Sequence, residues 1–155
     1  MLFLLFQLGK EHYALEASQV SEVLPLLGLK EIPHSPCGVA GVFNFRGIAV
    51  PAIDLSELTL GRPAQRQLST RIILVNYPDE KGGKHLLGLI AEKATETMRR
   101  EPKDFIASGI TNDAAPYLGP VTADPRGFIQ WIKVDQLLPV AVRDMLFKQS
   151  LQSLS

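Results

Sequence analysis

The most constraining feature of the sequence is residues 41–55, where two apolar segments flank a single arginine and a glycine. Residues 42–45 and 48–53 are rich in residue types that favour β-strands. Gly47, between them, supplies the positive φ that a tight turn requires. The run therefore predicts a β-hairpin with Arg46 and Gly47 at its tip.

The end of this run predicts how the second strand stops. Pro51 has no backbone N–H, so it belongs at an edge or a bulge of that strand. Asp54 is suited to cap a helical turn, and Glu57 three residues later would complete a capping box. Folding does not require Arg46, because glycine or asparagine would turn the chain as well. Its charge at the tip of an apolar hairpin suggests a function.

The same run resembles the Gly-x-x-Asn-x-Arg-Gly-x-x-x-Pro-x-x-Asp-Leu signature of CheW-like domains, the adaptors of bacterial chemosensory arrays. Residues 6–15 and 20–23 are similar to the opening strands and first helix of that family. Residues 87–92 resemble its central strand, and residues 129–138 its closing strand and helix. The resemblance covers residues 3–140 in the family's order.

Length and composition favour one globular domain in a reducing compartment. The 155 residues are enough for a substantial core, and sixteen basic residues balance sixteen acidic ones. No net charge therefore attracts nucleic acid or an anionic membrane. The single cysteine, Cys37, excludes an intrachain disulfide and is interpreted as a small residue in a loop. The apolar run at residues 2–6 is too short for a signal peptide or membrane span, so it predicts a strand buried on both faces of a cytosolic protein.

Short strands separated by glycine and proline predict an all-β fold with a few short helices. The predicted strands and helices are residues 2–8 with 12–15, a helix beginning at Glu16 or Ser18 with Val20, Val23, Leu24 and Leu27 on one face, residues 71–77 with 85–91 around a polar tip at 78–84, a short strand at 94–99, residues 117–123 with 127–134, and a helix from an Asp135 cap through Leu138. Composition alone leaves one barrel or two open. The resemblance implies two SH3-like five-stranded β-barrel subdomains packed around a shared hydrophobic core.

Residues 141–155 lie beyond the domain assigned to residues 1–140. Phe147, Leu151 and Leu154 recur at helical spacing, which predicts a short helix docked on the barrels or a frayed end. The alternative is an association helix for a partner or for another copy of the chain, which would produce weak self-association.

The sequence contains no recognisable catalytic or metal-binding motif. His12, His34 and His85 fall on different predicted elements, and none has a second ligand at metal-site spacing. The glycine-rich tip at residues 81–84 precedes a strand, whereas a phosphate-binding loop precedes a helix. We therefore expect no catalytic, metal or cofactor site and no enzymatic activity, although a site assembled from distant loops would leave no such motif.

The resemblance implies a non-enzymatic adaptor that joins the cytoplasmic tip of a methyl-accepting chemoreceptor to the regulatory domain of a CheA-type histidine kinase. It implies a cytoplasmic protein at membrane-bound receptor arrays, with no nucleic-acid partner and no membrane insertion. The matching positions imply a partner-binding set, which consists of Val20, Glu22, Val23, Asn44, Arg46 and Gly47. Two alternatives are a barrel of SH3-like or OB-like type that binds peptide or single-stranded nucleic acid, and a small enzyme with a dispersed site.

Structural roles for the same residues stay open at this point. The two valines of the set would equally suit the core, and Arg46 could brace the loop from inside. The chain also departs from the family pattern after its central strand, where Glu92, Lys93, Ala94 and Thr97 replace an aspartate followed by apolar residues. The segment at residues 24–28, Leu-Pro-Leu-Leu-Gly, is also unusual for the family. These departures would mark an adaptor of a system other than flagellar chemotaxis.

Overall fold

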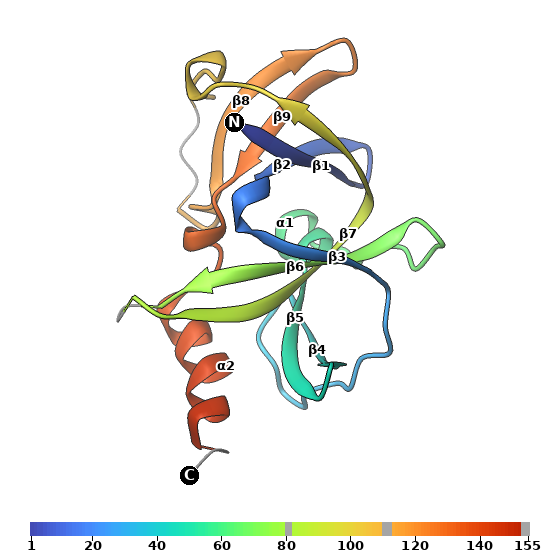
Figure 1. Cartoon of the computed structure of the whole chain (residues 1–155), viewed down its shortest axis with the longest axis vertical. Helices are drawn as coiled ribbons and strands as arrows, with labels where there is room; N and C mark the ends of the chain where they lie inside the picture. The colour runs from blue at the N-terminus through green and yellow to red at the C-terminus, as the bar shows by residue number, and fades with distance from the viewer. Residues whose placement is uncertain (80–81, 110–112, 153–155) are drawn as a thin grey trace.

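Strand β7 (Lys84–Arg99) is the longest element, and the other strands are arranged around it (Figure 1). The computed structural model describes residues 1–79, 82–109 and 113–152. The first part of β7 pairs antiparallel with β6 (Thr70–Pro78) and parallel with β5 (Ile48–Asp54). Its last part pairs antiparallel with β1 (Leu2–Leu8). One strand therefore belongs to two groups of strands.

The strands divide into two halves that share β7. The first half has the order β3 (Val20–Pro25), β6, β7, β5 and β4 (Val39–Phe45). The second half has the order β7, β1, β2 (Glu11–Glu16), β9 (Gly127–Ile132) and β8 (Leu118–Asp124). Each half contains five strands when β7 is counted in both, and each includes one parallel pair, β5 with β7 and β2 with β9. The prediction of an all-β fold built from two five-stranded units is confirmed.

Two isolated bridges bring the edges of each half together. In the first half, Lys30 follows β3 and exchanges two backbone hydrogen bonds of 2.8 and 2.9 Å with Val42 on β4. In the second half, Ile106 follows β7 and exchanges two bonds of 2.8 and 2.9 Å with Val121 on β8. Each bridge joins the continuation of one edge strand to the opposite edge strand. Both halves are closed in the same way, as a barrel requires.

Three hydrophobic clusters fill the molecule, and the largest is shared by the two halves. It joins Phe6 and Leu15 of the second half to Ile53 and Leu89 of the first. The two smaller clusters fill one half each and are centred on Phe43, Val50 and Ile72 and on Phe3, Phe105 and Trp131. Residues of β1 alternate between the shared cluster and the second-half cluster, which confirms the prediction of a strand buried on both faces. Burial of this apolar surface is the main force holding the halves together.

Helix α1 (Leu55–Leu60) begins where the predicted cap lies. The Asp54 side chain accepts a hydrogen bond of 3.2 Å from the Glu57 backbone N–H, and one of 3.0 Å from the Ala64 N–H. The prediction of an Asp54 cap is confirmed, and this buried aspartate is a structural residue. Pro51 lies one residue before β5 begins to pair with β7 at Ala52, so its missing N–H interrupts no bond on that side.

The helix predicted from Glu16 or Ser18 is wrong. A single turn, η1 (Ala17–Gln19), is followed by strand β3. Val20 pairs with Val75 and Glu22 with Leu74, so β3 carries one extra residue, a β-bulge. The bulge puts Val20 and Val23 on the same face although they are three residues apart. Because that spacing is also the spacing of a helix face, the sequence pattern mimics a helix.

Two other predicted elements differ from the structure. Residues 94–99 do not form a separate strand, because β7 continues through a bulge between its pairings of Glu92 with Gln7 and Glu96 with Leu5. Asp135 is not a cap but the middle residue of η3 (Val134–Gln136), because the chain begins to turn earlier, at Lys133. A further single turn, η2 (Pro102–Asp104), follows β7.

Helix α2 (Val140–Gln152) packs on the end of the β6–β7 hairpin. The buried Phe147 ring stacks on His85 with centroids 4.4 Å apart and lies 5.8 Å from the Tyr77 ring. The Tyr77 hydroxyl donates to the Asp135 carbonyl at 3.3 Å and accepts from the Leu138 N–H at 3.2 Å. The structure therefore contains a docked helix, as one of the sequence interpretations predicts. Leu154 of that pattern, and Glu80 and Lys81 of the predicted hairpin tip, lie outside the described residues.

Within the described ranges, no helix has both the length and the apolar character needed to cross a membrane.

The bridge that closes the first half should depend on Gly41. Its φ is +145°, and a Cβ at this position would lie 2.3 Å from the Lys30 carbonyl oxygen. Gly41→Ala should therefore cost about 3 kcal/mol of unfolding free energy, measured by chemical denaturation. Gly28→Ala is the control, because nothing lies within 4 Å of a Cβ there. Equal stability of the two variants would contradict this account of closure.

Docking of α2 should depend on Phe147. Phe147→Ala removes the ring that stacks on His85, and it should weaken docking by about 3 kcal/mol. Hydrogen exchange should then show lost protection of α2 amides, while amides of the β6–β7 ladder keep theirs, because that ladder has its own core contacts. Unchanged protection of α2 would show that other contacts hold the helix.

Candidate functional site

The hairpin between β4 and β5 ends in a two-residue turn made by Arg46 and Gly47. Phe45 pairs with Ile48 across it, and the two turn residues have φ values of 50° and 87°. Positive φ at both positions defines a type I′ turn, the turn whose twist matches a hairpin. The Asn44 side chain accepts a hydrogen bond of 2.7 Å from the Gly47 N–H. Asn44 and Gly47, both predicted as contact residues, therefore also build the turn.

Arg46 occupies a backbone position that disfavours arginine. Left-handed conformations are uncommon outside glycine, asparagine and aspartate, and they cost roughly 1–2 kcal/mol per residue. The sequence has a long charged side chain there, although glycine or asparagine would adopt the same turn at a lower conformational energy. An outlier of this kind is a reason to look for a role of the side chain.

The Arg46 side chain joins the hairpin tip to strand β3. Its guanidinium donates to the Glu22 carboxylate at 2.9 Å and lies over the Phe45 ring at 4.7 Å from the ring centre. The two paired side chains are 72% and 39% exposed, so most of the guanidinium faces solvent. An exposed pair of this type contributes about 0.2–1 kcal/mol. The pair fixes the direction of Arg46 more than it stabilises the fold.

Strand β3 presents the other predicted contact residues on two faces. Glu22 lies opposite Leu74, whose side chain belongs to the first-half cluster, and so faces the hairpin tip. Val23 lies opposite Ile73, whose side chain belongs to the shared cluster. Val20 packs partly buried against that shared cluster, while Val23 is 39% exposed. Of the two valines, Val23 is therefore the more exposed, and Val20 packs against the core.

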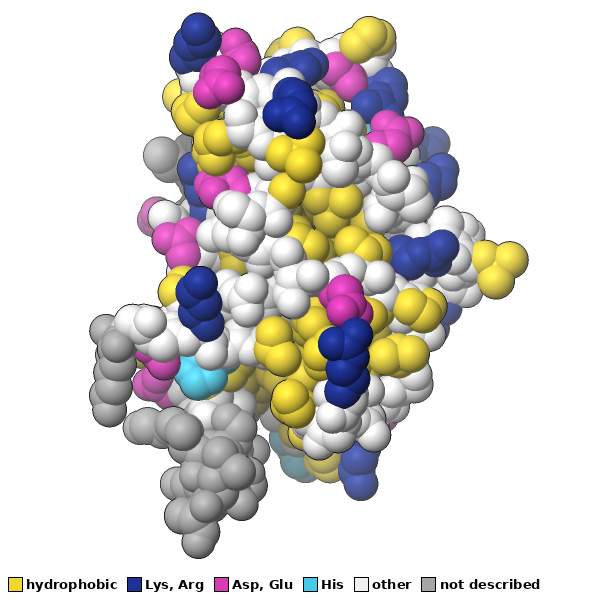
Figure 2. Space-filling view, in the orientation of Figure 1, with side chains coloured by type: hydrophobic (Ala, Val, Ile, Leu, Met, Phe, Trp, Pro, Cys, Tyr) yellow, Lys and Arg dark blue, Asp and Glu magenta, His cyan; other side chains and the backbone are white. Residues whose placement is uncertain are grey.

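The structure therefore brings Glu22 and Arg46, which are 24 residues apart in sequence, into direct contact. Hydrophobic side chains surround a pair of opposite charges on this face, over β3 and the β4–β5 hairpin (Figure 2). Ile48 is 53% exposed beside the tip and was not among the predicted residues. The sequence feature that could have pointed to Ile48 is its place directly after the two-residue turn, opposite Phe45. We call the following group the tip surface: the exposed Arg46 and Ile48, the partly buried Glu22 and Phe45, and Val23, which is exposed next to Glu22 on the other face of β3.

Two hollows elsewhere in the described part of the chain bring together no recognisable catalytic set of side chains. The larger one, of about 860 Å³, lies between the β1–β2 turn and α1 and is lined by side chains of both signs, including Lys10, Arg62 and Glu92. Among the described residues, no group of three or more His, Cys, Asp or Glu side chains is placed to hold a metal ion.

Comparison with known proteins agrees with this architecture. The model of the CheW-like domain matches residues 2–142. The chain is 32% identical over 104 residues to a chemotaxis protein CheW of Helicobacter pylori, covering 66% of this chain and 59% of that protein. It is 25% identical over 138 residues to the Treponema pallidum protein of the same name, covering 85% and 78%.

A solved structure shows the same fold. The crystal structure of the scaffolding protein TtCheW from Thermoanaerobacter tengcongensis superimposes with a TM-score of 0.79 at 26% identity, covering 94% of this chain and 92% of the other. The match to the Helicobacter pylori protein, by contrast, spans less than two thirds of that protein's length. Since the domain match includes nearly all of the residues, the chain belongs to the CheW-like domain family.

Proposed function

We propose that this protein is a non-enzymatic adaptor of a bacterial chemosensory array. It couples the cytoplasmic tip of a methyl-accepting chemoreceptor to the regulatory domain of a CheA-type histidine kinase, and it acts in the cytoplasm at membrane-bound arrays. The family match over residues 2–142 supports this proposal, as do relatives named chemotaxis protein CheW and a structural neighbour described as a scaffolding protein. Residues 1–140 carry the adaptor domain, and residues 141–155 extend it.

The observation that carries the proposal is the tip surface. Arg46 has a left-handed backbone conformation, and the turn does not need an arginine side chain to fold. Most of that side chain is exposed. Two apolar side chains are exposed near it, Ile48 directly after the turn on β5 and Val23 next to Glu22 on β3. An arginine beside exposed apolar side chains is a common composition of an energetically important contact. Asn44 and Gly47 support this contact by shaping the turn, and Val20 supports it by packing β3 against the shared cluster.

Binding to the two partners is the direct test. The protein should be retained by a chemoreceptor cytoplasmic fragment and by the kinase regulatory domain in pull-down assays. Retention by neither, together with salt-sensitive binding to single-stranded nucleic acid, would favour the alternative of a nucleic-acid-binding barrel. Retention by a proline-rich or extended peptide alone would favour the peptide-binding alternative.

Arg46 variants should separate binding from stability. Arg46→Ala should lower the unfolding free energy by no more than about 2 kcal/mol, because it loses an exposed pair and one guanidinium–ring contact. It should weaken partner affinity by about tenfold or more, the loss expected of an interface arginine. Arg46→Lys should restore part of that affinity, since lysine keeps the charge but not the planar fork.

Arg66→Ala is the matched control, because Arg66 is exposed in the segment after α1 and away from the tip surface. Its affinity for both partners should equal that of the parent. A large loss of stability in Arg46→Ala with unchanged affinity would make Arg46 a structural brace and would remove the tip surface from the proposal.

A further inference from the structure

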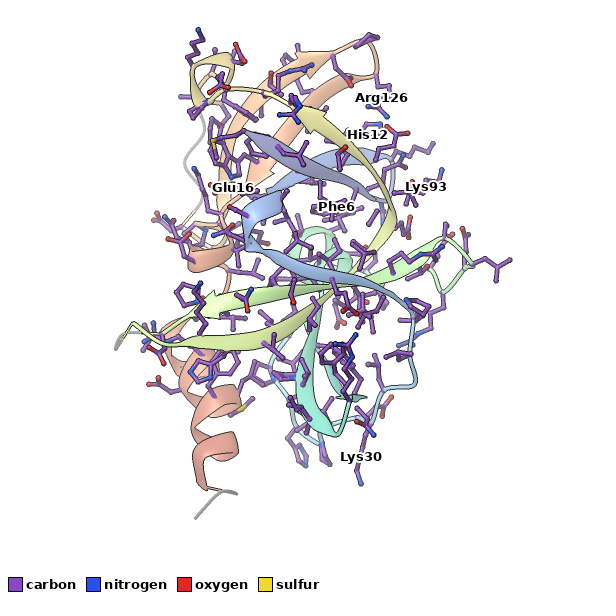
Figure 3. All side chains as sticks on the ribbon, in the orientation of Figure 1. Phe6, His12, Glu16, Lys30, Lys93 and Arg126 are labelled. Atoms are coloured by element: carbon purple, nitrogen blue, oxygen red, sulfur yellow. The ribbon has the colours of Figure 1, made fainter. Side chains whose placement is uncertain are left out.

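A second, smaller hollow lies on β1, β2, β6 and β7, where the two halves meet beside the β7 bulge. Its volume is about 180 Å³. Its lining includes four basic residues from separate elements, His12, Arg71, Lys93 and Arg126, together with the hydroxyl-bearing Ser69 and Thr95, one acidic residue, Glu96, and the β1 residues Leu5, Phe6 and Gln7. His12, Lys93 and Arg126 lie along the same side of the molecule, far from Lys30 (Figure 3). We call this hollow the junction cavity.

Lys93 is the unusual member of the junction cavity. It lies in the bulge of β7 with a φ of 53°, and its backbone N–H donates to the Ser69 carbonyl at 3.0 Å. Within the part of the chain that the structure describes, no carboxylate forms an ion pair with its ammonium group. Among the described residues, Lys93 therefore lies at the cavity without a charge partner.

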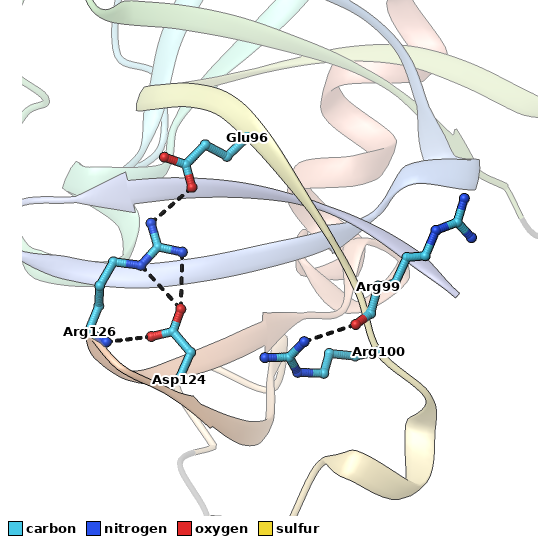
Figure 4. Close-up of polar contacts among 5 residues, drawn as sticks. All are labelled: Glu96, Arg99, Arg100, Asp124 and Arg126. Atoms are coloured by element: carbon cyan, nitrogen blue, oxygen red, sulfur yellow. Dashed lines mark hydrogen bonds and ion pairs between the residues drawn. The ribbon is translucent and has the colours of Figure 1, made fainter.

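Arg126 forms one wall and is already paired (Figure 4). Its guanidinium contacts Glu96 at 2.9 Å and Asp124 at 3.0 Å. Burial alone would raise the pKa of Asp124, but hydrogen bonds from Arg126 and electrostatic interaction with Arg126 and His12 lower it, so this carboxylate stays ionised. These two carboxylates offset two of the three permanent positive charges, leaving an excess of one. Arg71 donates to the Leu68 and Thr70 carbonyls, which fixes its guanidinium beside the cavity.

The charge and the size together indicate one class of ligand. Pockets for drug-sized molecules span about 300–1,000 Å³, so a hollow of about 180 Å³ suits a single small group. We propose that the junction cavity binds one oxyanion, a phosphate or carboxylate group, between Lys93 and Arg71 with help from His12 and the two hydroxyls. Because the lining comes from β6 of the first half and β2 of the second, a bound oxyanion bridges the halves.

This proposal does not depend on the adaptor function. It explains one departure of this chain from the family pattern, since Lys93 stands among the residues that follow the central strand. A phosphate group could arrive free or on a modified partner, and a carboxylate would come from an acidic side chain of a partner. In each case the group recognised is an oxyanion. Titrations with phosphate and with acetate distinguish the two kinds of group.

The test is an NMR titration of the full chain, labelled with ¹⁵N, with sodium phosphate at constant ionic strength. Constant ionic strength removes the general screening that any salt produces. Amide signals of Ser69, Lys93 and Thr95 should shift in a saturable way. Lys93→Gln should weaken the apparent affinity by about tenfold, the effect of one lost charge contact near the surface. Lys30→Gln, which removes an exposed lysine at the opposite end, should bind as the parent does.

A parallel titration with sodium acetate shows whether the cavity prefers a phosphate or a carboxylate group. Tighter binding of phosphate supports the proposal with a phosphate-bearing ligand, and equal or tighter binding of acetate supports it with a carboxylate. Absence of saturable shifts with both anions would overturn it. So would equal affinity of folded Lys93→Gln and the parent, or an equal loss in Lys30→Gln.

Discussion

The shared strand β7 is the constraint on which the rest of the structure depends. It pairs with β5 and β6 in one half and with β1 in the other, so neither half can form its sheet without it. At Gly88 an added Cβ would lie 2.6 Å from the Phe43 ring and 2.9 Å from the Ile72 side chain. The residue at that position must therefore have no side chain, so that Phe43 and Ile72 of the first-half core can pack against the strand. The bulge at Lys93 then redirects the same strand into the second half.

This arrangement positions the tip surface, the contact surface that we propose. The hairpin tip protrudes from the first half, and its base is held by β7 and by the capped turn at Asp54. The ion pair of Arg46 with Glu22 is too exposed to add much stability, but it gives the guanidinium one direction. For the binding that we propose, a side chain already held in one direction lowers the conformational entropy that is lost when the partner binds.

Sequence patterns predicted local features better than pairings between distant segments. The hairpin tip followed from Gly47 and its β-forming flanks, and the Asp54 cap from local spacing. The β3 strand was missed because its bulge gives Val20 and Val23 helical spacing. The continuity of β7 was missed because its bulge interrupts the alternation that marks a strand. The bridges at Lys30 and Ile106, and the contact of Glu22 with Arg46, depend on tertiary approach that no short window of sequence contains.

The measurement that tests the central claim most directly is an NMR footprint of the unmodified protein in complex with a chemoreceptor cytoplasmic fragment and, separately, with the kinase regulatory domain. The account predicts that at least one partner shifts or broadens the signals of Glu22, Val23, Arg46 and Ile48, while α2 amides change little. Saturable binding of both partners with these four residues unperturbed would contradict it, because the tip surface would then be a feature of the fold alone.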